Sequence, residues 1–172
     1  MPLPFLSWLN LRTNTSDSDE EVLEVVEKIP TRKSMLDIMT KYEDFFNDDS
    51  YIYFGSELDG SSARKKIKNA INAYANEDGY SPHGELLLLL DITLLGSAKA
   101  GIYVTDTHIY SKALFVSDPF SISIRDIEKL HLYKGRGEIE INGYDDISYC
   151  HPEVETAMKM LILCIEEYNS QY

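Results

Sequence analysis

The residue types best suited to chemistry are scattered thinly along this chain. Its four histidines are His83, His108, His131 and His151. None stands four residues from another histidine or an acid in a predicted helix, and the chain has no HExxH or Cys-x-x-Cys motif. Zinc sites depend on such spacings, because they bring ligands together on one face. The sequence therefore predicts no metal centre.

The adjacent pair Cys150 and His151 offers a nucleophile beside a base. Neighbouring side chains in an extended segment point to opposite sides, whereas a catalytic dyad needs contact. We therefore expect a structural cysteine and a capping histidine. Cys164 falls near the apolar stripe of a predicted helix and is expected in the core. The paired acids Asp48-Asp49 and Asp145-Asp146 fall in predicted turns without EF-hand spacing. These patterns favour a protein that is not an enzyme and holds no cofactor.

Charge narrows the classes of partner. The 172 residues include 29 acids and 16 bases, which gives a net charge of −13. The electrostatic field of this negative net charge repels phosphate, which argues against nucleic acid as a ligand. An apolar fraction of 44% is enough for a folded core, and the length predicts one main domain. Two cysteines and no apolar run of about 20 residues favour a cytoplasmic protein.

One dense basic run interrupts this acidity. Arg64, Lys65, Lys66 and Lys68 fall in the first turns of a helix predicted over 61–76. Cations there oppose the helix dipole, so helix energetics alone do not favour them. One interpretation is that these four residues bind an anion or an acidic partner. The other is that they pair with the chain's own segment 1–60, which holds 13 acids and 5 bases.

Three further residues are candidate secondary contacts. Lys134 and Arg136 stand at the tip of a predicted hairpin, where they could touch an acidic partner. Trp8 belongs to the apolar stretch 1–11, which also contains Phe5. This stretch either packs on the protein's own body or makes a weak contact with a membrane surface through Phe5 and Trp8.

Apolar periodicity predicts helices first and strands later. Helical spacing follows the acidic cluster 17–21 as far as Ile29, and a second helix is expected from an N-cap at Thr31 to Phe46. After a short strand at 51–54 comes the helix 61–76. A helix over 152–169 closes the chain, beginning at Pro152. Between these last two helices we expect short antiparallel strands, the first buried on both faces. Their expected ranges are 85–91 with a continuation at 93–96, then 101–105, 108–110, 112–116, 120–124, 129–133, 138–141 and 147–149.

Two sequence features in this strand region resemble bacterial pleckstrin-homology (PH)-like domains. One is the hairpin from Gly101 to Tyr110, with Thr105-Asp106 at its turn, and the other is the stretch from Ile122 to Ile127. Lys68-Asn69-Ala70-Ile71 and Gly96-Ser97-Ala98-Lys99 are also similar to uncharacterised chains of that type.

The resemblance covers about residues 85–168. It implies an α+β protein in which N-terminal helices precede a PH-like antiparallel β-barrel or sandwich, capped by a long C-terminal helix. The expected domains are an acidic, mostly helical extension over 1–60 and a PH-like domain over 61–172.

The resemblance also bears on ligands. PH domains hold phosphoinositide head groups with several Lys and Arg around the first hairpin, but here residues 86–105 contain Lys99 alone. We therefore expect no phosphoinositide binding, and what remains is a scaffold for protein contacts.

The leading hypothesis is a non-enzymatic, cytoplasmic protein–protein interaction module of bacterial type. The alternative is an acidic inhibitor or immunity-type protein that binds a basic toxin or nuclease. A hydrolase or transferase with an unrecognised site is a third hypothesis.

Overall fold

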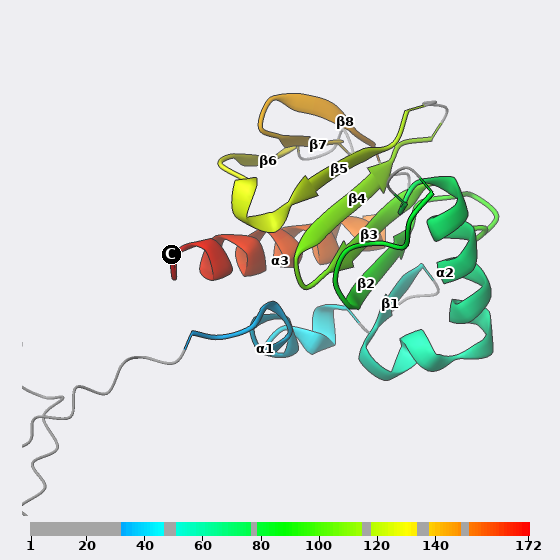
Figure 1. The fold of residues 1–172 in the computed structure, drawn as a ribbon, viewed down its shortest axis with the longest axis horizontal. Coiled ribbons are helices and arrows are strands. Elements are labelled where there is room, and N and C mark those ends of the chain that lie inside the picture. The colour runs from blue at the N-terminus through cyan, green and yellow to red at the C-terminus, as the bar shows by residue number, and fades with distance from the viewer. Residues whose placement is uncertain (1–31, 47–50, 77–78, 115–117, 134–137, 149–151) are drawn as a thin grey trace, which may run out of the picture. The chain divides into compact units, whose positions relative to one another are not determined.

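The apolar run Leu86 to Leu90 forms the second strand of a five-stranded antiparallel sheet (Figure 1). The computed structural model describes residues 32–46, 51–76, 79–114, 118–133, 138–148 and 152–172. The sheet order is β1-β2-β3-β4-β5. Its strands are β1 (Ile52–Phe54), β2 (Leu86–Asp91), β3 (Gly101–Thr105), β4 (His108–Lys112) and β5 (Phe120–Ser123). The short 3-10 turns η1 (Glu43–Phe45) and η2 (Gly55–Asp59) flank β1.

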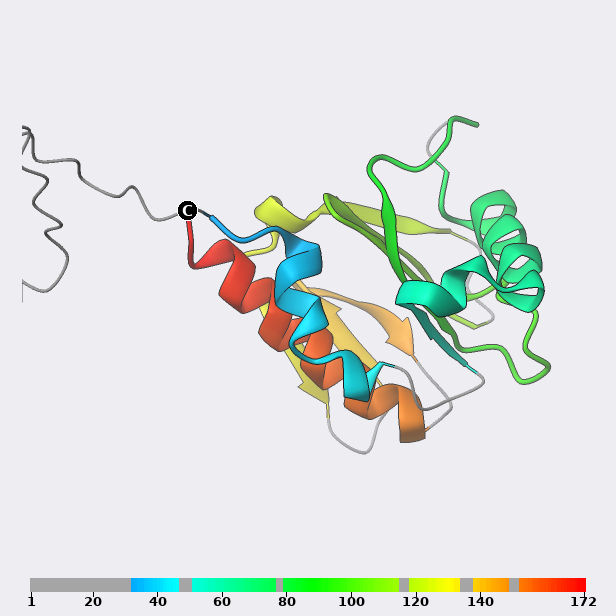
Figure 2. The same cartoon turned by 90° about the horizontal axis from the view of Figure 1, so that it is seen from below.

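Both faces of this sheet are covered. Leu88 and Leu90 point into a large cluster shared with the helices α1 (Met35–Thr40) and α3 (Pro152–Asn169). Leu89, between them, packs on the opposite face in a smaller cluster beneath α2 (Ser61–Ala73). Figure 2 shows α2 on one side of the sheet and α1 with α3 on the other. The prediction of a first strand buried on both faces is confirmed.

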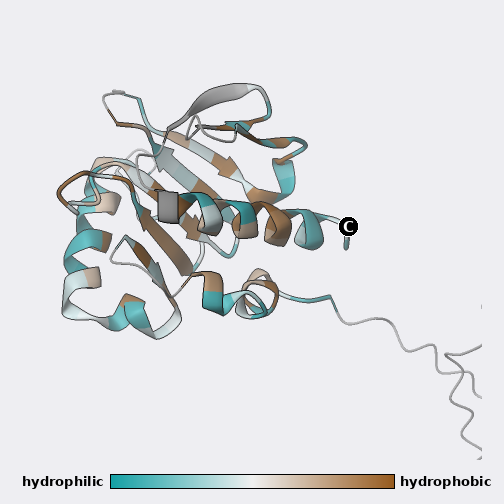
Figure 3. Ribbon diagram, turned by 180° about the vertical axis from the view of Figure 1, so that it is seen from behind, coloured by the Kyte–Doolittle hydropathy of each residue, from teal (hydrophilic) through white to brown (hydrophobic). Residues whose placement is uncertain are grey.

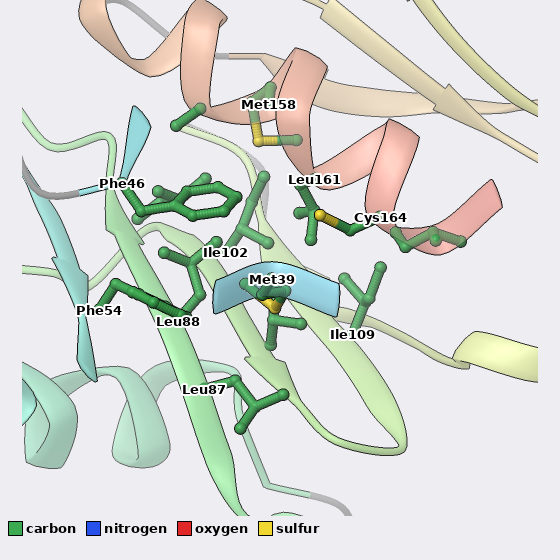
Figure 4. Packing of buried hydrophobic residues seen from close by; sticks show 14 of the residues in the cluster. Met39, Phe46, Phe54, Leu87, Leu88, Ile102, Ile109, Met158, Leu161 and Cys164 are labelled. Carbon is green, nitrogen blue, oxygen red and sulfur yellow. The ribbon is translucent and has the colours of Figure 1, made fainter. Parts of the chain in front are cut away.

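A second, three-stranded sheet follows the 3-10 turn η3 (Ile124–Asp126). It contains β6 (Leu130–Tyr133), β7 (Glu138–Ile141) and β8 (Tyr144–Ser148) in sequential antiparallel order. Apolar residues of β3, β4, β6, β7 and α3 face one small shared void. Figure 4 shows Met158, Leu161 and Cys164 of α3 beside Met39, Leu88, Ile102 and Ile109.

The expectation was a β-barrel or a sandwich, and the barrel is wrong for the described residues, which form two separate sheets. After β5 the chain makes the helical turn η3, which ends the hydrogen-bonded ladder. The apolar face of α3 then packs where the sheets diverge. The coarser prediction of an α+β protein with short antiparallel strands and a C-terminal helix is confirmed. Figure 3 shows the apolar residues gathered on the central strands, in contrast to the largely hydrophilic α2.

Helix α1 docks against α3 through apolar and charged contacts. Met35, Ile38 and Met39 are buried. At the helix start, Ser34 and Asp37 form a capping box, so Ser34 and not the predicted Thr31 is the N-cap. Lys41 pairs with Glu167 of α3, and this interaction lowers the pKa of that carboxyl group.

Several local expectations change in the structure. Residues 93–96 form a loop rather than a continuation of β2, and Lys112 ends β4 instead of starting another strand. Asp145 and Asp146 belong to β8, not to a turn. The helices predicted over 61–76 and 152–169 are observed as Ser61–Ala73 and Pro152–Asn169. The predicted helix after residue 17, the pair Asp48-Asp49 and the pair Cys150-His151 lie outside the described residues.

Residues 33–172 form one compact unit. Within it, β1 pairs with β2 in the register Tyr53 to Leu89, so part of the predicted extension over 1–60 contributes a strand to the main sheet. The predicted domain boundary between residues 60 and 61 stays a prediction. Among the described helices, none is both long enough and apolar enough to cross a membrane.

Truncation of the Leu88 side chain in β2 tests how strongly the core stabilises the fold. Leu88→Ala is expected to lower the free energy of unfolding by about 2–5 kcal/mol, because Leu88 is fully buried. Leu95→Ala removes the same atoms from a side chain that is 95% exposed, and should change stability by less than about 0.5 kcal/mol. Urea denaturation measures both values. Similar losses in the two variants would contradict the assigned burial.

Tyr103, in the smaller cluster beneath α2, is expected to make the protein less stable at alkaline pH. Burial, together with the neighbouring Tyr110, raises the pKa of Tyr103 to about 12. An unfolded tyrosine titrates near pH 10, so the stabilising contribution of neutral Tyr103 is complete below about pH 10. It is lost as the pH rises from there through about 12.

Urea denaturation at about pH 9 and pH 11 tests this expectation. Tyr103→Phe should lose less stability over that interval than the unmodified chain. Tyr80→Phe, which changes an exposed side chain, should behave like the unmodified chain. Equal losses in all three proteins would show that Tyr103 does not contribute.

Candidate functional site

A polar stripe on α2 forms the first wall of the candidate site. Ser62, Lys65, Lys66 and Asn69 follow one another at helical spacing, so they lie along one side of the helix. Ala63 and Ala70 are buried, and Ile67 packs partly on the small cluster. The apolar side of α2 therefore faces the sheet, while the polar stripe faces the loop between β2 and β3.

That loop, residues 92–100, forms the second wall and is shaped by Asp91. The Oδ1 atom of Asp91 accepts hydrogen bonds from the Thr93 backbone N–H at 3.0 Å and from its hydroxyl at 2.5 Å. The Thr93 hydroxyl oxygen in turn accepts from the backbone N–H groups of Ser97 and Ala98. Ala98 packs into the cluster beneath α2. The loop is thus anchored at both ends of its bend.

A direct hydrogen bond joins the two walls. The side-chain amide of Asn69 donates to the backbone oxygen of Ser97 at 2.8 Å. Gly96, beside it, has a φ of +64°, which favours glycine, and a Cβ built there would lie 3.2 Å from Nζ of Lys66. The loop backbone therefore approaches the helix closely enough that a side chain at position 96 would press on Lys66.

Between the walls is an open groove of about 510 Å³. We call it the lysine groove, and its lining residues are Ser62, Lys65, Lys66, Asn69, Leu95, Gly96, Ser97 and Lys99. None of these residues is acidic, although the chain as a whole carries a net charge of −13. Leu94 and Leu95 project from the loop, with exposed fractions of 65% and 95%. The groove thus combines positive charge with exposed apolar surface.

Lys66 forms the inner part of the groove and contacts the sheet. Its Nζ lies 3.1 Å from Oδ2 of the fully buried Asp91 and 4.8 Å from the centre of the Tyr53 ring. Partial burial acts to lower the pKa of Lys66, but its interactions with Tyr53 and Asp91 outweigh this effect and raise the pKa above its ordinary value. Lys66 is therefore held in its charged form.

The structure divides the predicted basic cluster into two pairs. Lys65 and Lys66 line the groove, whereas Arg64 and Lys68 are exposed on α2 outside it. Trp8, Lys134 and Arg136 lie outside the described residues, as does Phe5. Lys66 forms an ion pair with Asp91 of β2. Arg64, Lys65 and Lys68 have no ion-pair partner within the described ranges.

Sequence reasoning predicted two of the eight residues that line the groove, Lys65 and Lys66. It singled out neither Ser62 nor Asn69, although both continue the stripe of Lys65 and Lys66 at helical spacing. Lys99 was noted as the single base of the first hairpin but was not assigned to the site. The partnership of Lys66 with Asp91 spans 25 positions of sequence, and no local pattern indicates it.

His83, His108 and Cys164 do not line the lysine groove. The rings of His83 and His108 lie 5.1 Å apart, and His108 also stacks on Tyr110. Cys164 is buried, as expected, and burial raises the pKa of its thiol to about 12. Across the described part of the chain, no group of three or more His, Cys, Asp or Glu side chains is arranged to hold a metal ion.

Comparisons with protein families, with curated proteins and with solved structures find nothing that matches this chain.

The ion pair beneath the groove can be tested by removing one partner. Lys66→Met is expected to lower the free energy of unfolding by about 3–5 kcal/mol, because it leaves the Asp91 carboxylate buried without its cation. Lys65→Met changes an exposed neighbour that has no ion pair among the described residues, and should cost less than about 0.5 kcal/mol. Urea denaturation of the two single variants provides the comparison. A mild effect of Lys66→Met would mean that the Asp91 carboxylate does not depend on Lys66.

Proposed function

We propose that this chain is a non-enzymatic protein–protein interaction module that binds an acidic segment of its partner in the lysine groove. The observation that carries the proposal is a groove lined by Lys65, Lys66 and Lys99, without an acidic residue, on a strongly acidic protein. Opposite charge promotes the encounter of an acidic segment with the groove. The acidic surfaces elsewhere on this chain repel the same segment.

Leu94 and Leu95 favour a protein partner over a small anion. Side chains this exposed add apolar area beside the charges, and binding surfaces of proteins combine an apolar centre with a polar rim. A free phosphate would use the lysines but gain nothing from the leucines. The chemistry that fits is a segment with carboxylates around an apolar side chain.

The proposal includes a PH-like scaffold in a cytoplasmic protein. Seven antiparallel strands, β2 to β8, precede a C-terminal amphipathic helix, which is the order of elements in the resemblance described above. The hairpin of β3 and β4 joins at Thr105 to His108, where the resembling motif lies. Such a scaffold leaves its loops available for contacts, because its helices and sheets cover one another.

Two matched double charge reversals test the site. The probe is the acetylated peptide Glu-Glu-Leu-Glu-Glu, and Gln-Gln-Leu-Gln-Gln is its uncharged control. Lys65→Glu with Lys99→Glu should weaken binding of the acidic peptide at least about tenfold, since two attractive contacts become repulsive. Arg64→Glu with Lys68→Glu changes net charge equally but outside the groove, and should weaken binding less than about threefold.

Isothermal titration calorimetry at low salt measures these affinities. Equal weakening by the two double variants would mean that only net charge matters and that the groove is not the site. Binding of the control peptide as tight as that of the acidic peptide would also contradict the proposal.

A separate observation favours the alternative function of an acidic inhibitor. A second open groove at β6, β7 and α3 has more acidic than basic lining residues, which are Glu128, Lys129, Leu130, His131, Tyr133, Glu140 and Glu166. A basic peptide such as Lys-Lys-Leu-Lys-Lys would bind there if the chain blocks a basic protein. Binding of that peptide, lost in Glu128→Gln with Glu166→Gln, would favour the inhibitor over the module proposed above.

A further inference from the structure

The three lysines of the groove differ in how much of their charge is already matched. Lys65 and Lys99 are exposed and have no ion pair among the described residues. The side chain of Lys66 is only 13% exposed, and its ammonium lies 3.1 Å from the fully buried Asp91. An approaching acidic segment therefore meets two uncompensated cations and one that already has a carboxylate partner.

Breaking the contact between Lys66 and Asp91 would cost substantial free energy. Asp91 is buried within the fold, and its other oxygen is occupied by Thr93. If Lys66 turned wholly toward a ligand, the Asp91 carboxylate would stay buried without its cation, which is strongly destabilising. Lys66 is thus expected to keep Asp91 when a partner binds. A lysine ammonium has three N–H donors, so it can still donate one to the groove.

We propose that Asp91 is the specificity-determining residue of the lysine groove. Asp91 compensates the charge of Lys66, so the net attraction of the groove for an acidic segment comes from Lys65 and Lys99. Two cations match a segment with two carboxylates rather than a more highly charged one. This inference rests on the function proposed above, because it assumes that acidic segments bind in this groove.

Removing the Asp91 charge should change selectivity, not only affinity. The probes are Gln-Glu-Leu-Glu-Gln, which has two carboxylates, and Glu-Glu-Leu-Glu-Glu, which has four. The unmodified chain should bind them within about threefold of each other. Asp91→Asn removes the carboxylate from beside Lys66, and should raise the preference for the four-carboxylate peptide to at least about tenfold.

Two double variants with the same net charge separate this effect from the general field of the protein. Asp91→Asn with Lys66→Met removes both partners of the ion pair, so the preference for the four-carboxylate peptide should return to that of the unmodified chain. Asp91→Asn with Lys68→Met removes a lysine outside the groove, so the raised preference should remain. Circular dichroism and urea denaturation establish that each variant is folded. Equal preferences in the two double variants would overturn the inference.

The unmodified chain gives a second readout that needs no substitution. Nitrogen NMR of lysine ammonium groups should show the Lys66 signal in its ion-paired state before and after saturation with the four-carboxylate peptide, while the Lys65 and Lys99 signals shift. A Lys66 signal that moves as far as those of Lys65 and Lys99 would show that the ligand takes Lys66 from Asp91, and would overturn the inference.

The two proposals fail in different ways. If neither acidic peptide binds the unmodified chain, or if the Lys65 and Lys99 reversal has no effect, the proposed function fails and the role of Asp91 fails with it. If the peptides bind in the groove but Asp91→Asn leaves their relative affinities unchanged, only the role of Asp91 is wrong.

Discussion

The arrangement around the groove depends on the carboxylate of Asp91. This carboxylate lies at the end of β2, fully buried, where a charge is tolerated only with partners. One oxygen receives two hydrogen bonds from Thr93 and thereby sets the bend of the following loop. The other faces Lys66 and so ties α2 to the sheet. A strand end, a loop and a helix are positioned by one side chain.

Burial on both faces of the main sheet explains why the candidate site lies where it does. The run Leu86 to Leu90 must be covered on each side, so α1, α3 and the small sheet occupy one face while α2 occupies the other. Little of the sheet surface is left for a ligand. Contacts with other molecules must therefore use loops and the outward sides of helices, and the lysine groove combines one of each.

Local patterns in the sequence predicted the elements well. Helical spacing located α3 at Pro152–Asn169, and a turn after an apolar run located β3 at Gly101–Thr105, because both signals arise within a few neighbouring residues. That the described strands form two sheets and not a closed barrel was not predictable in this way. Whether two sheets close depends on how the chain turns at η3 and on how α3 packs between them, which are properties of tertiary packing.

The candidate site was predictable only in part, for a similar reason. An unusual basic run at Arg64 to Lys68 marks α2 as a surface helix, but the division of that run into two pairs follows from the orientation of the helix on the sheet. Lys99 and Asp91 belong to a different part of the sequence and meet α2 only in the folded protein. In the sequence, Lys99 is an isolated base and Asp91 is the last residue of a strand. Only the fold brings them beside Lys66.

The small apolar face of α2 has a consequence for local opening. Only Ala63 and Ala70 of this helix are buried, whereas α3 buries several large side chains. Less apolar area therefore opposes the detachment of α2 than that of α3, and the Lys66–Asp91 ion pair and the Asn69–Ser97 hydrogen bond add polar contacts to its attachment. Amide hydrogens of α2 should exchange with solvent deuterium well before those of α3, in a local opening that leaves the main core intact. A bound segment bridging the helix and the loop would slow that exchange without adding to the core.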